Sequence, residues 1–365
     1  MIVADDLTGA CDAAVQFRLR GAKSIVHLES ALQLETETEV DAFSTNTRDS
    51  DGTEIEARIR GIADLFADRP LDVVFQKIDS VMRGNPGKQI VAIMDAFACE
   101  VAVITPAFPE MGRRVEDGRL QVSDDSQEPI NVLAVLKRQG LEDCVHTVPQ
   151  RLGTSIRSGN RLISLDAACN KDLSVIVHEA LHSGCRILWV GSGGLASALA
   201  AALLSESAAP YLSCAAVKGP VLFCIGSDHA VTQAQLTVLS KERTVCDFVA
   251  ERSSRPAISA ALRNGRHVVL RAVHATDFEE LGVLAACVAQ DAGALLLSGG
   301  TTASMICKAL RAGSIQVENE ITPGVPAGVL RGGHFDFLPI ATKSGGFGDV
   351  HTLVRVADSF VCCRN

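Results

Sequence analysis

Short apolar segments alternate with amphipathic segments along the whole chain, and this alternation constrains the fold most. Residues 71–75 form an apolar run that predicts a buried strand, and residues 89–98 carry apolar side chains at helical spacing. The same pairing of strand and helix recurs in both halves of the sequence. Alternation of this kind is typical of α/β folds. We therefore predict two α/β domains with mainly parallel sheets that are covered by helices.

The length of the chain supports two domains, since 365 residues exceed the usual size of one. Residues 205–218 contain small residues and a proline and show no sustained period. We predict that they link a first domain, residues 1–204, to a second domain, residues 219–365. Because only 4% of the residues are aromatic, the cores should be aliphatic.

Charge and composition exclude several classes of protein. A net charge of −9 and the lack of a basic stripe argue against a nucleic-acid partner. No apolar run reaches about 18 residues, so we expect no membrane partner. The twelve cysteines show neither zinc spacing nor a C-x-x-C pair, and no signal-like segment opens the sequence. These features predict a cytoplasmic protein with reduced cysteines.

Residues 76–88 concentrate cations, a carboxylate, a hydroxyl and glycines just after the predicted strand. In open α/β sheets, ligands bind at the carboxyl ends of strands. Backbone amides and a helix N-terminus add positive potential there, which favours an anionic substrate. The alternative is an ordinary solvated turn.

Two adjacent carboxylates, Asp5 and Asp6, follow a first predicted strand, and Thr8 is predicted to cap the next helix. The pair suits base or metal chemistry, unless one of the two simply caps the helix. A polar loop at residues 45–50 is a further candidate for substrate contacts. The candidate substrate-binding residues are Asp5, Thr8, Thr45, Arg48, Lys77, Asp79, Ser80, Arg83 and Gly84.

The second half contains three turns that are rich in glycine and hydroxyl residues, each after a predicted strand. None is a Walker A sequence, but together they predict a phosphate cradle made of backbone amides. Taken singly, each turn could be a plain connection between strand and helix. The candidate cofactor-binding residues are Ser227, Gly299, Gly300, Thr301, Thr302, Lys343, Gly345 and Gly346.

Residues 191–196 fit the G-x-G-x-x-A string of dinucleotide-binding proteins. No acidic residue closes a following strand about 20 residues later, as that fingerprint requires. An NAD-dependent dehydrogenase is therefore a weaker alternative.

Taken together and in this order, the segments resemble the four-carbon acid sugar kinase family. The resemblance implies an N-terminal domain that binds the sugar acid, a C-terminal domain that binds ATP, and an active-site cleft between the domains. It implies ATP-dependent phosphorylation of a terminal hydroxyl of threonate, erythronate or 3-oxo-tetronate, with Mg²⁺ bridging the phosphates. The matching segments are residues 5–10, 77–87, 106–112, 191–196, 226–227, 298–303, 320–328 and 343–348.

Several positions depart from the family pattern. Gln76 stands where lysine is common, His229 where a second serine is usual, and Thr301 where an acidic residue is usual. A ligand-binding member of the same fold with weakened catalysis is therefore the second reading.

The chemistry of the substrate assigns roles to these candidates. The carboxylate of a sugar acid needs cations or other donors, and Arg83, with Ser80 and Gly84, is the best equipped to supply them. Lys77 can serve either end of the substrate. The accepting hydroxyl needs a base, for which Asp6 is the first candidate and Asp79 the second. The expected partners are the sugar acid and ATP, while the metal ligands and a homo-oligomeric state are left open.

Overall fold

The computed structural model describes residues 1–28, 34, 37–123, 128–205, 219–273 and 277–360. The chain divides into two compact units, Met1–Lys23 with Ser30–Ala208 and Ser24–Glu29 with Ala209–Asn365. The predicted linker lies outside the described residues, apart from Ser205. Residues 24–29, which the sequence placed in the first domain, belong to the second unit because their strand pairs there.

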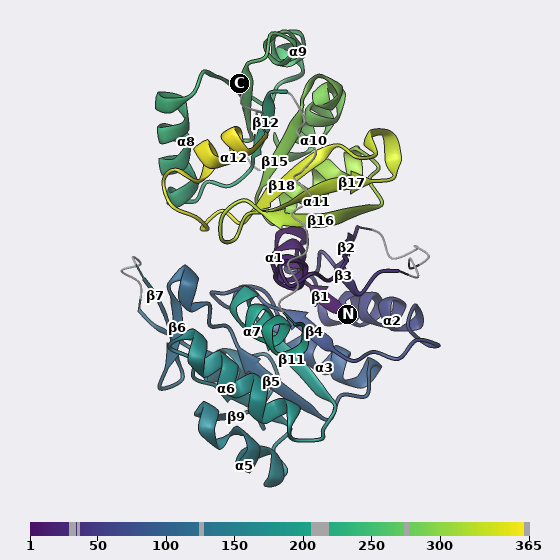
Figure 1. The fold of residues 1–365 in the computed structure, drawn as a ribbon, viewed down its shortest axis with the longest axis vertical. Coiled ribbons are helices and arrows are strands. Elements are labelled where there is room, and N and C mark those ends of the chain that lie inside the picture. Colours follow the sequence, from purple (N-terminus) through teal and green to yellow (C-terminus); the bar gives the residue numbers. More distant parts are fainter. Residues whose placement is uncertain (29–33, 35–36, 124–127, 206–218, 274–276, 361–365) are drawn as a thin grey trace. The chain divides into compact units, whose positions relative to one another are not determined.

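The first unit contains a parallel sheet with the strand order β3-β1-β4-β11-β5-β10-β9. Helices α1, α6 and α7 pack together, and α2 packs on α3 (Figure 1). The elements are β1 (Ile2–Ala4), α1 (Leu7–Arg18), β3 (Val40–Ser44), α2 (Gly52–Asp64), β4 (Val74–Lys77), α3 (Pro86–Ala96), β5 (Val101–Thr105), α4 (Val132–Arg138), β9 (Val145–Thr147), α5 (Leu152–Arg157), β10 (Leu162–Leu165), α6 (Asn170–Leu181), β11 (Ile187–Gly191) and α7 (Gly193–Leu203).

A small antiparallel sheet follows β5 in the first unit, where the sequence shows only a polar, irregular stretch. Its strands are β6 (Arg113–Glu116), β7 (Arg119–Val122) and β8 (Ile130–Asn131). Asp117 and Gly118 join β6 to β7, and both have positive φ angles, 49° and 70°. Two such residues in succession match the twist of a tight hairpin.

The second unit has a parallel sheet, β13-β14-β12-β15-β18, that continues through β17, β16 and β2 with antiparallel pairing. Both units are therefore α/β with mainly parallel sheets, which confirms the predicted fold class. The elements are β2 (Ser24–His27), β12 (Val221–Ile225), α8 (Ala230–Glu242), β13 (Val245–Val249), α9 (Arg255–Arg263), β14 (His267–Arg271), α10 (Asp277–Val288), β15 (Ala294–Ser298), α11 (Gly300–Ala309), β16 (Ser314–Glu320), β17 (Pro326–Arg331), β18 (Pro339–Lys343) and α12 (Thr352–Phe360).

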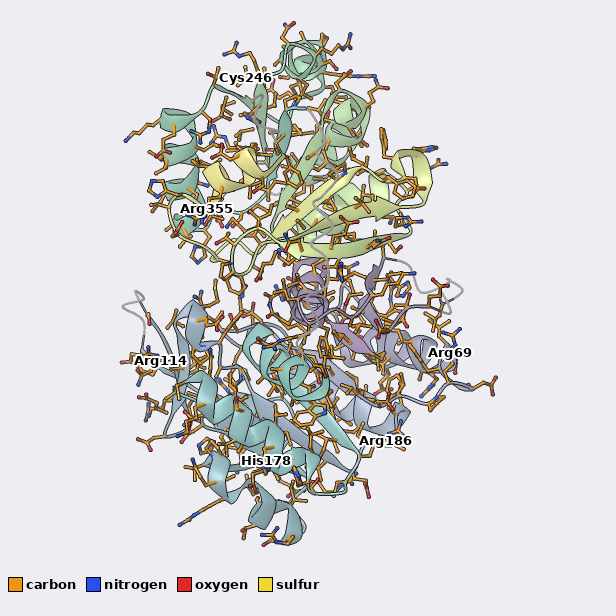
Figure 2. The ribbon with its side chains drawn as sticks, viewed as in Figure 1. Arg69, Arg114, His178, Arg186, Cys246 and Arg355 are labelled. Carbon is orange, nitrogen blue, oxygen red and sulfur yellow. The ribbon has the colours of Figure 1, made fainter. Side chains whose placement is uncertain are left out.

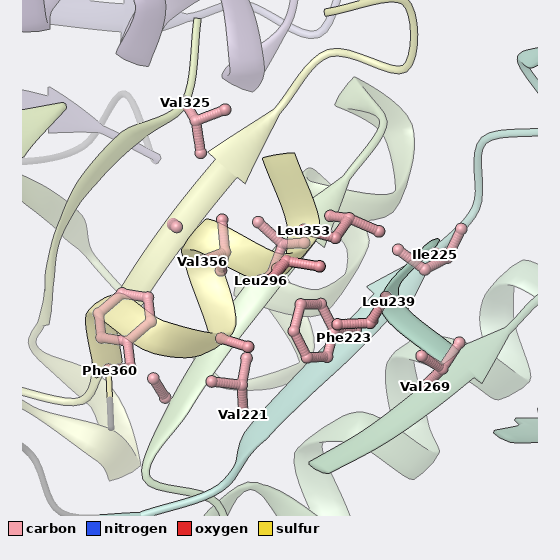
Figure 3. Close-up of a cluster of buried hydrophobic side chains, with 14 of the residues drawn as sticks. Val221, Phe223, Ile225, Leu239, Val269, Leu296, Val325, Leu353, Val356 and Phe360 are labelled. Atoms are coloured by element: carbon pink, nitrogen blue, oxygen red, sulfur yellow. The ribbon is translucent and has the colours of Figure 1, made fainter. Parts of the chain in front are cut away.

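One core cluster of the second unit lies between this sheet and the helices α8 and α12 (Figure 3). Phe223 of β12 and Leu296 of β15 point from the sheet toward Leu239 of α8 and Leu353 of α12, and all four are buried. Arg355 of α12, which is labelled in Figure 2, pairs with Asp349 in the loop after β18. Helix α12 therefore both contributes side chains to the core and fixes the end of the loop after β18.

Candidate functional site

The polar loops of the first unit meet at one edge of its sheet. Strands β3, β1 and β4 are adjacent and parallel, and Ala4 pairs in register with Ser44 on one side and with Lys77 on the other. The residues that follow these strand ends therefore emerge close together. They include the carboxylate pair after β1, the polar loop after β3 and the basic loop after β4.

Arg48 is the centre of this edge. Its Nε and Nη2 atoms donate to Asp5 Oδ2 at 2.9 Å and Oδ1 at 2.8 Å, which is a bidentate pair. Its Nη1 atom lies 2.7 Å from Asp6 Oδ2, and Nη2 lies 3.8 Å from Asp79 Oδ2. The three carboxylates are buried, with side chains 6%, 10% and 8% exposed. One guanidinium group thus pairs closely with two of the three buried carboxylates and lies near the third.

Asp6, and not the predicted Thr8, caps helix α1. Asp6 Oδ1 accepts from the backbone N–H of Gly9 at 2.6 Å. Thr8 is the second residue of the helix, and its hydroxyl donates to the Asp6 carboxylate at 3.3 Å. Because Asp6 is the N-cap, its other oxygen is held toward Arg48.

Arg83 and Asp79 form a second ion pair in the loop after β4. Arg83 Nη2 donates to Asp79 Oδ2 at 2.6 Å, and the backbone N–H of Val81 donates to Asp79 Oδ1 at 3.0 Å. The Arg83 side chain is 60% exposed, unlike Arg48. Gly84 has φ +83°, and a Cβ there would lie 3.0 Å from Asp5 Oδ2, so glycine is needed on both counts.

The carboxylates of this edge differ in their affinity for protons. Burial raises the pKa of Asp5 to about 6, against the opposing effect of Arg48. Burial also acts on Asp79, but the hydrogen bond from Arg83 and the charges of Arg83 and Arg48 outweigh it and lower the pKa to about 2. At neutral pH, Asp5 is therefore the stronger base of the two.

Lys77 ends β4 and points to a carboxylate that the sequence analysis missed. Its Nζ atom lies 3.3 Å from Asp12 Oδ2 and donates to the carbonyl of Ile78 at 3.3 Å. Asp12 is fully buried on α1, and burial raises its pKa although Lys77 opposes the shift. A signal was present, because an aspartate lies between a cysteine and an alanine in a predicted helix that is otherwise apolar at this point.

A chain of buried polar side chains supports the loop after β3. Gln76 Nε2 donates to Gln89 Oε1 at 3.1 Å, and Gln89 Nε2 donates to Thr47 Oγ1 at 3.1 Å. Thr47 and Thr45 share a hydrogen bond of 2.7 Å, and Thr45 Oγ1 donates to the carbonyl of Ala4 at 2.9 Å. Thr45, a predicted substrate ligand, therefore anchors the loop that carries Arg48. Ser80, in the loop after β4, is buried.

The three glycine-rich turns of the second unit also meet at one sheet edge. Strands β12, β15 and β18 are adjacent and parallel, with Ile225, Ser298 and Lys343 in register at their ends. The N–H of Gly226 donates to the carbonyl of Ser298 at 3.2 Å, and that of Gly299 donates to the carbonyl of Lys343 at 3.0 Å. The structure thus brings the three predicted turns together.

Close packing explains why glycines stand in these turns. A Cβ on Gly226 would collide with Thr302 Oγ1, and a Cβ on Gly345 would collide with Ser227 Oγ. Gly346 lies against the ring of His229, since its Cβ would be 3.0 Å from Nε2. The backbone of the turn after β18 therefore packs against the side chains of Ser227 and His229 in the turn after β12.

Helix α11 adds an N-terminus to this edge. Gly299 precedes it with φ +105°, Gly300 is its first residue, and Thr301 is exposed beside the buried Thr302. The hydroxyl of Ser298 is buried and has no hydrogen-bond partner among the described residues. Backbone amides, a helix N-terminus and hydroxyl groups form a donor set that suits phosphate.

Residues 191–194 are explained by packing and not by a dinucleotide. A Cβ on Gly191 would lie 2.6 Å from Leu195, and one on Gly194 would lie 2.6 Å from the carbonyl of Ala107. A Cβ on Gly193 would lie 2.7 Å from Phe108 and 2.9 Å from Asp12 Oδ2. Protein atoms fill the space next to each glycine, so the dehydrogenase reading loses its only support.

The described residues contain neither a metal-binding cluster nor a membrane-spanning helix. Within them, no cluster of three or more histidine, cysteine, aspartate or glutamate side chains is arranged to hold a metal ion. The helices in the same parts of the chain are too short or too polar to cross a membrane.

Two α/β units, one with a charged strand-end site and one with a glycine-rich site, are typical of a ligand-binding protein with two domains. A family model described as a sugar-binding N-terminal domain matches residues 1–133, and one described as a nucleotide-binding C-terminal domain matches residues 278–353. A crystal structure from Salmonella typhimurium LT2 shares this fold, with a TM-score of 0.76 at 20% identity over 97% of this chain and 98% of that one.

The sequence relatives are kinases. A D-threonate kinase of Bordetella bronchiseptica is 30% identical, covering 98% of this chain and 96% of the relative. A D-erythronate kinase of Heliobacterium modesticaldum is 27% identical, with coverage of 96% and 94%. A 3-oxo-tetronate kinase of Pseudomonas fluorescens is also 27% identical, with coverage of 95% and 93%. The chain belongs to the four-carbon acid sugar kinase family, which confirms the resemblance seen in the sequence.

Proposed function

We propose that the protein transfers the γ-phosphoryl group of ATP to the terminal hydroxyl of a four-carbon sugar acid. The observation that carries this proposal is similarity over nearly the whole chain to kinases named for D-threonate, D-erythronate and 3-oxo-tetronate. The descriptions of the two matching domains support a division of labour, with the acid bound by the first unit and ATP by the second.

The first unit is suited to hold the acid and activate its hydroxyl. Arg83 is the exposed cation of the edge, so it is the proposed ligand of the substrate carboxylate. Ser80, Gly84 and Lys77 adjoin it in the same segment. The proposed general base is a member of the Asp5–Asp6 pair, and the raised pKa of Asp5 favours that residue over Asp79.

The second unit is suited to hold the phosphates of ATP. The donors are the turns after β12, β15 and β18, with Ser227, Thr301 and Thr302 supplying hydroxyl groups. Bound Mg·ATP supplies the phosphoryl group and neutralises charge that develops during transfer. Mg²⁺ in such sites keeps several waters and phosphate oxygens as ligands, so a preformed carboxylate cluster is not required.

The cysteines support a location in the cytoplasm. Cys144 and Cys224 are buried thiols, and burial raises the pKa of Cys144 to about 11 and that of Cys224 further. Cysteines that stay unpaired are typical of proteins from reducing compartments, where disulfides rarely persist. We therefore place the enzyme in the cytoplasm.

A turnover screen tests the proposed function. The purified protein is incubated with Mg·ATP and, separately, with threonate, erythronate and 3-oxo-tetronate, while ADP release is followed. We expect turnover with at least one acid and little without any acid. ATP binding without turnover on any of the three would instead favour the ligand-binding reading.

Arg83→Ala is expected to raise the KM for the acid about tenfold or more, with a smaller change in kcat. Loss of a charge-assisted hydrogen bond costs about 1.5–3 kcal/mol, and every 1.4 kcal/mol is about tenfold in affinity. Steady-state kinetics at saturating ATP measure both constants. Arg58→Ala, at an exposed pair with Glu54, is the matched control. An unchanged KM in Arg83→Ala would place the carboxylate elsewhere.

A further inference from the structure

Lys343 ends β18 and is completely buried, although it is a lysine at the edge of a proposed phosphate site. Its Nζ atom donates to the carbonyl oxygens of Ser344 and Gly345 at 3.0 Å and of Phe347 at 3.2 Å. It also lies 3.2 Å from the hydroxyl of Thr232 on α8. The ammonium group therefore has four acceptors for its three protons, all supplied by the protein.

Burial makes this arrangement costly. No carboxylate contributes to the four contacts, and burial lowers the pKa of Lys343 to about 7. A buried ammonium is tolerated only where hydrogen bonds replace its water. The carbonyl groups of Ser344, Gly345 and Phe347 do so by turning inward. Thr232 secures the second of them, since its hydroxyl donates to the carbonyl of Gly345 at 2.8 Å.

The inward carbonyls determine where the amides point. In a trans peptide unit, the C=O and the following N–H point in opposite directions, and these units are trans. Because the carbonyls of Ser344 and Gly345 face Lys343, the N–H groups of Gly345 and Gly346 face away from it. Two successive amides directed to the same side form a concave site that suits an anion.

We propose that Lys343 is a positioning residue of the nucleotide site. It acts from beneath the loop 344–347, where it holds the carbonyls inward and so directs the amides of Gly345 and Gly346 to a phosphate of ATP. The sequence placed Lys343 among the candidate cofactor-binding residues without assigning a contact to its ammonium group. The inference rests on the proposed function, because it takes ATP as the ligand of the second unit.

Neighbouring residues provide a matched set of variants. Lys343→Met removes the ammonium and keeps most of the apolar stem. Thr232→Val removes one acceptor of Lys343 together with the hydrogen bond to Gly345. Thr342→Val is the control, because Thr342 is also buried, precedes Lys343 on the same strand, and has no partner for its hydroxyl among the described residues.

The kinetic test separates positioning from a general loss of structure. Lys343→Met is expected to raise the KM for ATP about tenfold, equivalent to ~1.4 kcal/mol, while the KM for the acid and kcat at saturating ATP stay within about twofold. Thr232→Val should shift the KM for ATP in the same direction by less, and Thr342→Val should match the wild type. If Lys343→Met does not fold, the KM for ATP of Thr232→Val tests the proposal in its place. Equal losses toward both substrates, or an unchanged KM for ATP, would overturn the proposal.

Hydrogen exchange in the protein without nucleotide supplies a test that does not depend on the reaction. Amides of residues 345–348 should exchange faster in Lys343→Met than in the wild type or in Thr342→Val. Unaltered exchange there would show that Lys343 does not order the loop and would overturn the inference, whatever the kinetics. Failure of the wild type to bind ATP would instead overturn the proposed function, and with it the nucleotide role of Lys343.

Discussion

Arg48→Met is expected to lower the free energy of unfolding by about 3–5 kcal/mol, the usual cost of removing one partner from a buried ion pair. Arg48 is the cation that pairs with both Asp5 and Asp6, whereas Asp79 keeps Arg83. Methionine preserves most of the packing of the aliphatic part of the arginine side chain. The loss of stability therefore measures the effect of removing the charge. Urea denaturation at pH 7 measures the difference.

The pH dependence of this loss identifies its cause. Without Arg48, the pKa of the buried Asp5 carboxyl rises further above its ordinary value, so the folded variant takes up a proton that the unfolded chain does not. Its deficit relative to the wild type should therefore be smaller at pH 5 than at pH 7. Arg58→Met, at a pair that is 49% exposed on both sides, should cost no more than about 1 kcal/mol at either pH. If Arg48→Met lost less stability than Arg58→Met, the buried carboxylates Asp5 and Asp6 would not need Arg48 for the fold to be stable.

Continuous apolar strands could be predicted from the sequence with their bounds. Val221–Ile225 is such a run, between Pro220 and Gly226, and the structure gives it the same ends. Val245–Val249 and Val40–Ser44 also keep the expected ends, although each contains an aspartate. The strand expected at residues 71–75 instead spans Val74–Lys77, because the buried site accommodates the polar Gln76 and Lys77. Because Gln76 and Lys77 are polar, the sequence pattern did not assign them to β4, although Lys77 is a candidate site residue.

The antiparallel part of the second sheet could not be predicted in this way. Gly328 and Pro326 look like turn residues, yet both lie in β17, where a Cβ on Gly328 would collide with the carbonyl of Gln316 in β16. Strand β2 pairs with β16, which lies far along the chain. Glycine is required at position 328 because β16 and β17 approach each other closely. The partner of β2 is distant in sequence, so no local pattern reveals it.

The grouping of the site residues was accessible from the sequence, but their contacts were not. Strand ends indicated that Asp5, Arg48 and Asp79 would meet at one edge, and the structure places them there. Asp12 was missed because it lies on a helix and not on a loop. The direction of Lys343 depends on how residues 344–347 turn, which is a property of the folded loop and not of residue type.

Asp5→Asn is expected to lower kcat by about 10²–10⁴-fold, the usual contribution of general-base catalysis. This prediction rests on the proposed function. A base works best when its pKa lies near the working pH, and burial brings the pKa of Asp5 to about 6, whereas that of Asp79 is about 2. Asparagine keeps an oxygen that accepts from Arg48, so the fold should persist; thermal unfolding of the variant checks this.

The pH profile distinguishes the carboxylates. If Asp5 is the base, kcat/KM of the wild type should fall as the pH drops through about 6, because the carboxylate gains a proton and can no longer accept one from the hydroxyl. Asp5→Asn should lose this acid limb together with most of its activity. Asp6→Asn, the first candidate from sequence, should keep the limb, and it should fold because asparagine also caps helices well. Full turnover in Asp5→Asn with a large loss in Asp6→Asn would assign the base to Asp6 instead, and full turnover in both would mean that positioning alone drives the transfer.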